Sequence, residues 1–76
     1  MRRIEFKMER PGQVETGQTV DITEGKLPSS FYYTIEPAVA MSGNYRLAES
    51  LMARQGKVID VEETPRGIFV TCEFNE

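Results

Sequence analysis

The chain contains no histidine. Histidine is the commonest general base at neutral pH and the commonest protein ligand of metal ions. Its absence excludes every Ser-His, Cys-His and His-metal arrangement, so a catalytic centre would need carboxylates, lysine, tyrosine or the one cysteine, Cys72. We therefore expect a non-enzymatic protein with no catalytic residue, no metal site and no cofactor.

Cysteine and long apolar runs are equally scarce. One cysteine permits no internal disulfide, which is typical of a reducing compartment. The opening residues, MRRIEFKMER, lack the apolar segment of a signal peptide. No apolar run approaches the roughly 20 residues that span a bilayer. These absences predict a protein of a bacterial-type cytoplasm that does not associate with membranes.

Positive charge is in short supply as well. Nine Lys and Arg residues face 12 Asp and Glu residues, which gives a net charge of −3. General nucleic-acid binders carry a basic surface that offsets the phosphates, so this balance disfavours nucleic acid as the partner. With 39% hydrophobic and 28% charged residues among 76, the composition predicts one globular domain over residues 1–76.

Alternation of apolar and polar residues predicts three strands in the first half of the chain, at residues 2–9, 18–23 and 31–36. Pro11-Gly12 and Gly25 mark turns between them, and Pro37 ends the third strand. Residues 38–44 leave two alternatives open, a short extended piece or a loose turn. A helical apolar stripe then predicts one short helix at residues 45–55, formed by Leu47, Ala48, Leu51 and Met52.

The last third of the chain, residues 56–74, has the pattern of a β-hairpin around the turn Thr64-Pro65-Arg66-Gly67. Pairing Glu63 with Ile68 gathers the apolar residues on one face: Ile59, Val61, Ile68, Val70, Cys72 and Phe74. A shift of one residue would mix the two faces, so burial predicts this register. We expect a four-residue loop or a bulge at the tip.

These elements predict an α+β, β-dominated fold in the order β-β-β-α-β-β. It is a five-stranded, mostly antiparallel bent sheet or small barrel, with one short helix before the C-terminal hairpin. Residues 1–11 carry a net charge of +2 and residues 58–76 one of −4, which favours pairing the first strand with the last. That pairing would close a barrel with the helix across one end. The predicted core contains Ile4, Phe6, Val20, Ile22, Tyr33, Ile35, Leu47, Leu51, Ile59, Val61, Val70 and Phe74.

Two segments of the hairpin carry a resemblance to known folds. The patterns G-K-V-x-x-V at residues 56–61 and G-I-F-V-T-C-E-F at residues 67–74 resemble those of small SH3-like and related barrel domains. The resemblance implies a barrel fold and no particular function, since small barrels host many unrelated roles.

Candidate binding residues come from aromatic side chains on outward strand faces and from the apolar loop at residues 37–45. We expect an unknown protein partner to bind a patch formed by Tyr32, Met41, Tyr45 and Phe69, in a chain that is a monomer or a weak homodimer. The loop would add Val39 to this surface. Two alternatives stay open: Phe69 packs under the helix or the 38–44 segment in a second small core, and the 37–45 loop is buried under the helix.

The alternative function is binding of single-stranded nucleic acid, with bases stacked on Tyr32 or Phe69. Phosphates would then meet Arg46, Arg54 and Arg66. A third hypothesis, a small enzyme, needs a concave pocket that holds acidic residues or Cys72. The sequence favours instead a solvated strand face for Asp60 and Glu62 and a buried thiol for Cys72.

Overall fold

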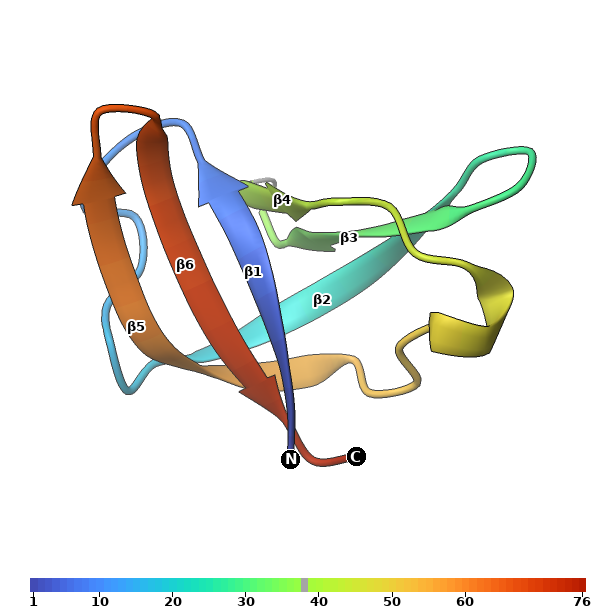
Figure 1. Ribbon diagram of the computed structural model, residues 1–76. Helices are drawn as coiled ribbons and strands as arrows, with labels where there is room; N and C mark the ends of the chain where they lie inside the picture. The colour runs from blue at the N-terminus through green and yellow to red at the C-terminus, as the bar shows by residue number, and fades with distance from the viewer. Residues whose placement is uncertain (38) are drawn as a thin grey trace.

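The computed structural model describes residues 1–37 and 39–76. In this part of the chain, six antiparallel strands form a closed barrel in the order β1-β4-β3-β2-β5-β6 (Figure 1). The elements are β1 (Arg2–Met8), β2 (Thr19–Lys26), β3 (Phe31–Ile35), β4 (Ala40–Ser42), the 3-10 helix η1 (Leu47–Glu49), β5 (Gln55–Thr64) and β6 (Gly67–Phe74). The predicted β-dominated fold is confirmed, and it is compatible with a small SH3-like barrel.

The first and last strands close the barrel, as their opposite charges predict. They pair antiparallel over their whole length, from Arg2 opposite Phe74 to Met8 opposite Ile68. One ion pair follows this seam, between Arg3 Nε and Glu73 Oε2 at 3.4 Å. The Arg3 side chain is largely exposed, so the pair adds little stability. Burial of the inward residues of both strands is therefore the larger stabilising term.

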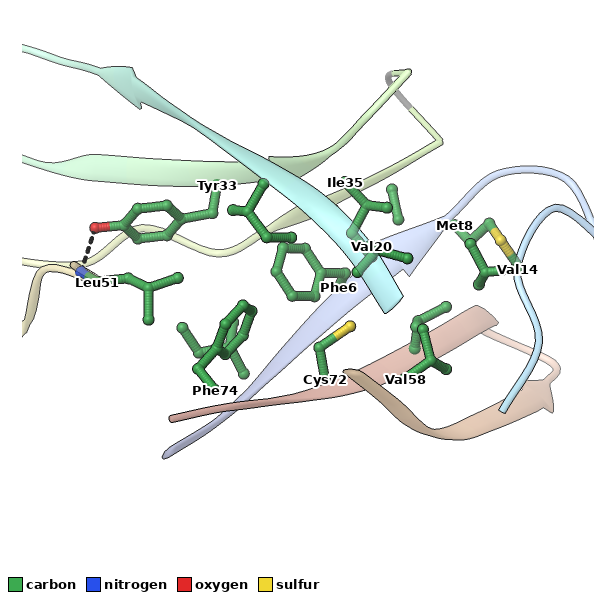
Figure 2. Close-up of a cluster of buried hydrophobic side chains, with 14 of the residues drawn as sticks. Phe6, Met8, Val14, Val20, Tyr33, Ile35, Leu51, Val58, Cys72 and Phe74 are labelled. Carbon is green, nitrogen blue, oxygen red and sulfur yellow. Dashed lines mark hydrogen bonds between the residues drawn. The ribbon is translucent and has the colours of Figure 1, made fainter. Parts of the chain in front are cut away.

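Alternate residues of the strands fill the interior, together with Val14 and Leu51 from the loops (Figure 2). Aromatic rings pack at its centre, where the centroids of Phe6 and Phe74 lie 6.4 Å apart. The buried apolar residues are Ile4, Phe6, Met8, Val14, Val20, Ile22, Tyr33, Ile35, Ala40, Leu51, Val58, Ile68, Val70, Cys72 and Phe74.

The predicted hairpin register is confirmed at its tip, where Glu63 lies opposite Ile68. The loop is shorter than predicted, because Thr64 pairs with Gly67 and only two residues lie between them. A bulge is present, but it lies between Val58 and Asp60. It leaves Ile59 half-buried and turns Val58 into the core instead, which corrects the predicted core. A bulge bends its strand, and this one lies within the pairing of β5 with β6, just after the residues of β5 that pair with β2.

The predicted helix at residues 45–55 is wrong, because only the three residues of η1 are helical. Both ends of this segment belong to the barrel: Tyr45 bridges to Phe31, and Gln55 pairs with Asp21. Of the predicted stripe, Leu51 is buried, but Leu47 and Met52 are 73% and 78% exposed. A short helix persists only where tertiary packing stabilises it. Here the pairings at Tyr45 and Gln55 favour an extended, irregular segment instead.

The open prediction for residues 38–44 is decided for the described part of that segment. Ala40–Ser42 form β4, which pairs with both β1 and β3 and so adds a sixth strand. Ala38 lies outside the described residues. None of the helices in residues 1–37 and 39–76 has the length and apolar character needed to cross a membrane.

Candidate functional site

One row of outward-facing side chains runs across four neighbouring strands near the tip of the β5–β6 hairpin. Lys7 on β1 lies opposite Met41 on β4 and opposite Phe69 on β6, and Phe69 lies opposite Glu62 on β5. We call the four residues Met41, Lys7, Phe69 and Glu62 the outer band. Because strand pairing fixes their spacing, the band is a rigid surface.

A shallow hollow of about 460 Å³ lies on the β6 side of Lys7. Phe69 is half-buried, so one part of its ring remains open to this hollow. The lining combines apolar groups with three charges: Glu5, Glu62, Thr64, Pro65, Arg66 and Phe69. We call it the Phe69 hollow.

The hairpin turn shapes the rim of the Phe69 hollow. The Thr64 hydroxyl donates to the carbonyl of Gly67 at 3.0 Å and accepts from the N–H of Arg66 at 3.2 Å. Gly67 has a positive φ of 138°, and a Cβ there would lie 2.9 Å from Cε of Lys7. The turn is therefore packed down onto β1, which fixes the position of the rim relative to the outer band.

A second hollow, of about 290 Å³, lies on the β4 side of Lys7. Met41 is 51% exposed beside it, although the core holds Ala40, its neighbour in sequence. The lining residues are Lys7, Glu9, Val39, Ala40, Met41 and Ser42. Apolar and charged groups therefore alternate along this side of the barrel as well.

The structure divides the four residues predicted to bind a partner. Met41 and Phe69 share the outer band, separated only by Lys7. Tyr32 leans away from them over Gly25 on β2, where a Cβ would lie 2.1 Å from Cζ of the tyrosine. Tyr45 packs at the barrel end, with its ring centroid 6.0 Å from that of Tyr33. The candidate site therefore keeps Met41 and Phe69 and leaves the other two outside it.

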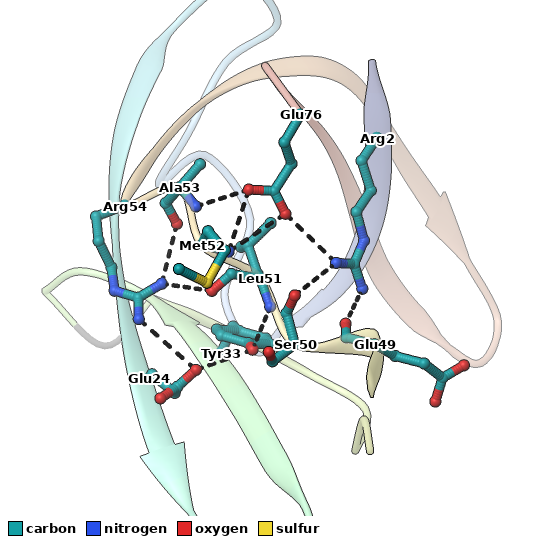
Figure 3. Close-up of polar contacts among 10 residues, drawn as sticks. All are labelled: Arg2, Glu24, Tyr33, Glu49, Ser50, Leu51, Met52, Ala53, Arg54 and Glu76. Carbon is teal, nitrogen blue, oxygen red and sulfur yellow. Dashed lines mark hydrogen bonds and ion pairs between the residues drawn. The ribbon is translucent and has the colours of Figure 1, made fainter. Parts of the chain in front are cut away.

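The three arginines proposed to meet phosphates do not gather either. Arg54 donates to the carbonyls of Leu51 and Ala53 at 2.7 and 3.2 Å, and its Nη2 lies 3.6 Å from Oε2 of Glu24 (Figure 3). Arg46 is exposed and precedes η1. Arg66 lies at the opposite end of β5, on the hairpin tip. Only Arg66 shares a hollow with a candidate aromatic residue.

A polar network holds the barrel end that carries η1 (Figure 3). Arg2 donates to the carbonyls of Ser50 and Glu49 and forms an ion pair with Glu76, with Nη1 3.4 Å from Oε1. The Glu76 carboxylate also accepts the N–H groups of Met52 and Ala53 at 3.1 and 2.9 Å. Partial desolvation raises the pKa of Glu76, but these N–H groups and Arg2 outweigh it, so the pKa is lowered.

No sequence pattern indicates this network, because Arg2 and Glu76 bind mostly backbone groups. Sequence patterns also missed a third hollow, of about 280 Å³, between the β2–β3 loop and η1. Its lining includes Leu27, Phe31 and Leu47. The helical pattern places Leu47 on a buried stripe. Its exposure is therefore evident only in the structure, where that helix is absent.

Covalent chemistry finds no support at Cys72. The thiol is buried, as predicted, and burial raises its pKa to about 11. Cys72 lines none of the three hollows. In residues 1–37 and 39–76, no group of three acidic or cysteine side chains is placed to hold a metal ion. Asp60 and Glu62 lie on an exposed strand face, as predicted.

Comparison of the chain with protein-family models, with curated proteins and with solved structures finds no match.

Proposed function

We propose that the protein is a non-enzymatic protein-binding module whose partner docks on the outer band. The observation that carries this proposal is the position of Phe69 and Met41 on either side of Lys7, where each residue lies beside a hollow in the surface. Phenylalanine, methionine and arginine are enriched in protein interfaces, and Arg66 completes the set at the rim.

The barrel core does not need these two side chains. Its interior is closed by residues of all six strands, whereas the Met41 side chain and part of the Phe69 side chain remain outside. Strand pairing holds the backbone of both residues in one geometry in the free and bound states. A partner therefore binds without ordering a loop, which reduces the entropic cost of association.

The exposed residues Leu47 and Met52 offer a competing surface. They lie on η1 and the irregular chain after it, where only three residues are helical. Sites built on strands are positioned more accurately than sites on loops. We therefore assign the docking surface to the outer band and use Met52 as the matched control.

The test is a capture experiment with the tagged protein in nuclease-treated cell lysate, read by mass spectrometry. We expect a defined set of proteins on the wild type, and a loss of about tenfold in their recovery with Met41→Ser or Phe69→Ala. Met52→Ser should retain them. Circular dichroism and thermal unfolding of each variant confirm that the barrel is intact. Loss of the set with Met52→Ser alone would move the docking surface to the other end of the barrel.

Single-stranded nucleic-acid binding is the second candidate, because Phe69 and Arg66 line the same hollow. Glu5 and Glu62 line it too, and their carboxylates repel phosphate. We expect nuclease to leave the captured set unchanged. Material that disappears with nuclease, and that binds less tightly as salt rises from about 50 to about 200 mM, would favour the nucleic-acid function.

We propose that the module acts in a bacterial-type cytoplasm. The single buried thiol supports a reducing compartment.

A further inference from the structure

Residues 46–53 connect two points at which the backbone is tied to the barrel (Figure 1). Before them, Tyr45 exchanges backbone hydrogen bonds with Phe31, and the two N–O distances are 2.7 and 2.8 Å. After them, the carbonyl of Arg54 accepts the N–H of Ile22 at 2.8 Å. We call residues 46–53 the strap, and its two ends are fixed by the strands.

Between these ends, the backbone of the strap bonds only to itself. Within residues 1–37 and 39–76, no backbone hydrogen bond joins the strap to a strand. Its two backbone bonds run from the N–H of Glu49 to the carbonyl of Arg46 and from the N–H of Ser50 to the carbonyl of Leu47, at 2.9 and 3.1 Å. One helical turn does not persist without tertiary contacts, so the strap depends on side chains for its position.

Three side chains from outside the strap bind its backbone (Figure 3). Arg2 donates to two strap carbonyls, the Glu76 carboxylate accepts two strap N–H groups and the Tyr33 hydroxyl accepts another. Leu51 is the one buried residue of the strap. Figure 2 shows it at the end of the core that holds Tyr33 and Phe74. One apolar side chain and a few polar contacts therefore hold the strap on the barrel.

We propose that the strap is a lid that opens as one unit while the six strands stay paired. Segments with few buried apolar groups and few backbone bonds to their surroundings open at a lower free energy than the core. The polar contacts fall on the five consecutive residues 49–53, so they break together. Opening withdraws Leu51 alone from the core, because the other buried apolar residues belong to the strands or to Val14. The open state has an apolar mouth at Tyr33 and Phe74, and none of these residues belongs to the outer band.

Native-state hydrogen exchange, measured amide by amide, tests the proposal. We expect the amides of Leu51, Met52 and Ala53 to share one opening constant, at least about tenfold larger than that of the slowest amides of β1 and β6. Opening of the strap exposes little surface, so its constant should depend only weakly on urea, whereas the strand amides follow the slope of global unfolding. Strap amides that exchange as slowly as the strand amides, or with three unrelated constants, would overturn the inference.

A core variant separates opening of the strap from unfolding of the barrel. Ile68→Val removes one methyl group at the end of β6 beside the hairpin turn, where Ile68 is buried opposite Met8. It weakens the packing of the strands and leaves the contacts of the strap intact. We expect the slowest strand amides to exchange about fivefold faster and the strap amides to keep their rate. Equal acceleration of both sets would show that the strap opens only when the barrel unfolds.

A second variant weakens the strap itself. Glu76→Gln removes the charge that binds Arg2 and two strap N–H groups, so the opening constant of the strap should rise about tenfold. The strand amides should accelerate by the same factor, because the strap is also released in the unfolded chain. Glu73→Gln is the matched control: it removes a charge that binds Arg3 and no strap residue, and strap exchange should not change. An unchanged strap constant in Glu76→Gln, or an equal rise in Glu73→Gln, would refute the role of Glu76 in holding the lid.

Discussion

At the scale of single residues, Tyr33 shows how burial sets the behaviour of a polar group. Its ring is fully buried, yet its hydroxyl accepts the N–H of Leu51 at 2.6 Å and donates to Oε2 of Glu24 at 3.0 Å. Burial raises the pKa of this hydroxyl. Tyr33 thus closes the core and also fixes the chain after η1, because it supplies the acceptor that the missing helix would have given Leu51.

Tyr33→Phe is expected to destabilise the protein. The change removes the acceptor and leaves the N–H of Leu51 without this partner in a buried position, at a cost of about 1–3 kcal/mol in the free energy of unfolding. Urea unfolding measures it. Tyr32→Phe is the matched control on the outer surface, and we expect a change within about 0.5 kcal/mol. Equal effects at the two positions would contradict the role given to the Tyr33 hydroxyl.

At the scale of elements, β5 carries a residue at which the packing of the core leaves no room for a side chain. Gly56 is buried where β5 pairs with β2, and an added Cβ would lie 2.4 Å from Cε1 of Phe74. The ring of Phe74 occupies the space that a side chain would need. The Phe74 ring can therefore pack against β5 here only because residue 56 is glycine.

Gly56→Ala is expected to lower the free energy of unfolding by about 1–3 kcal/mol, since Phe74 or the strand must move. Gly43→Ala is the control, because nothing lies within 4 Å of the position of its Cβ, and we expect less than about 0.5 kcal/mol there. Thermal and urea unfolding of both variants give the comparison. A stability of Gly56→Ala equal to wild type would show that Phe74 is not tightly packed at this point.

The elements also show how far sequence patterns reach. Period-two alternation placed β1, β3 and the β5–β6 register, because one-sided burial leaves a regular pattern in each. The pattern at residues 45–55 wrongly indicates a helix, since Leu47, Leu51 and Met52 have helical spacing although only Leu51 is buried. The bulge at Ile59 and the three-residue β4 leave no periodic signal.

In the candidate site, the sequence predicts Phe69 and Met41 as binding residues. It does not predict that they lie on either side of Lys7, because this arrangement depends on the pairing of β1 with both β4 and β6.

At the scale of the whole molecule, the ends of the chain hold the barrel end together. Arg2 and Glu76 clamp residues 49–53 from the first strand and from beyond the last one. One carboxylate and one guanidinium therefore hold this irregular segment in place. The clamp depends on the charge of Glu76, so it couples the stability of this end to pH.

We expect the stabilising contribution of Glu76 to disappear in acid. The pKa of Glu76 is lowered in the folded protein, so its contribution is complete above the ordinary pKa of a glutamate. It is lost as the pH falls through the lower, folded value. The gap in melting temperature between wild type and Glu76→Gln should therefore narrow from about pH 7 to about pH 3. Glu15→Gln should show no such narrowing, and a constant gap for Glu76→Gln would contradict the clamp.

The seam between β1 and β6 has a consequence for how the protein reaches its fold. Its partners, such as Arg2 and Phe74, come from opposite ends of the chain, so the loop closed by each pair includes almost every other residue. Barrels dominated by such pairs fold in about milliseconds to seconds, slowly for their size. During synthesis, Ile4, Phe6 and Met8 leave the ribosome before β6 and stay without their partners in this strand until β6 emerges. The first strand is therefore the segment that a chaperone would meet.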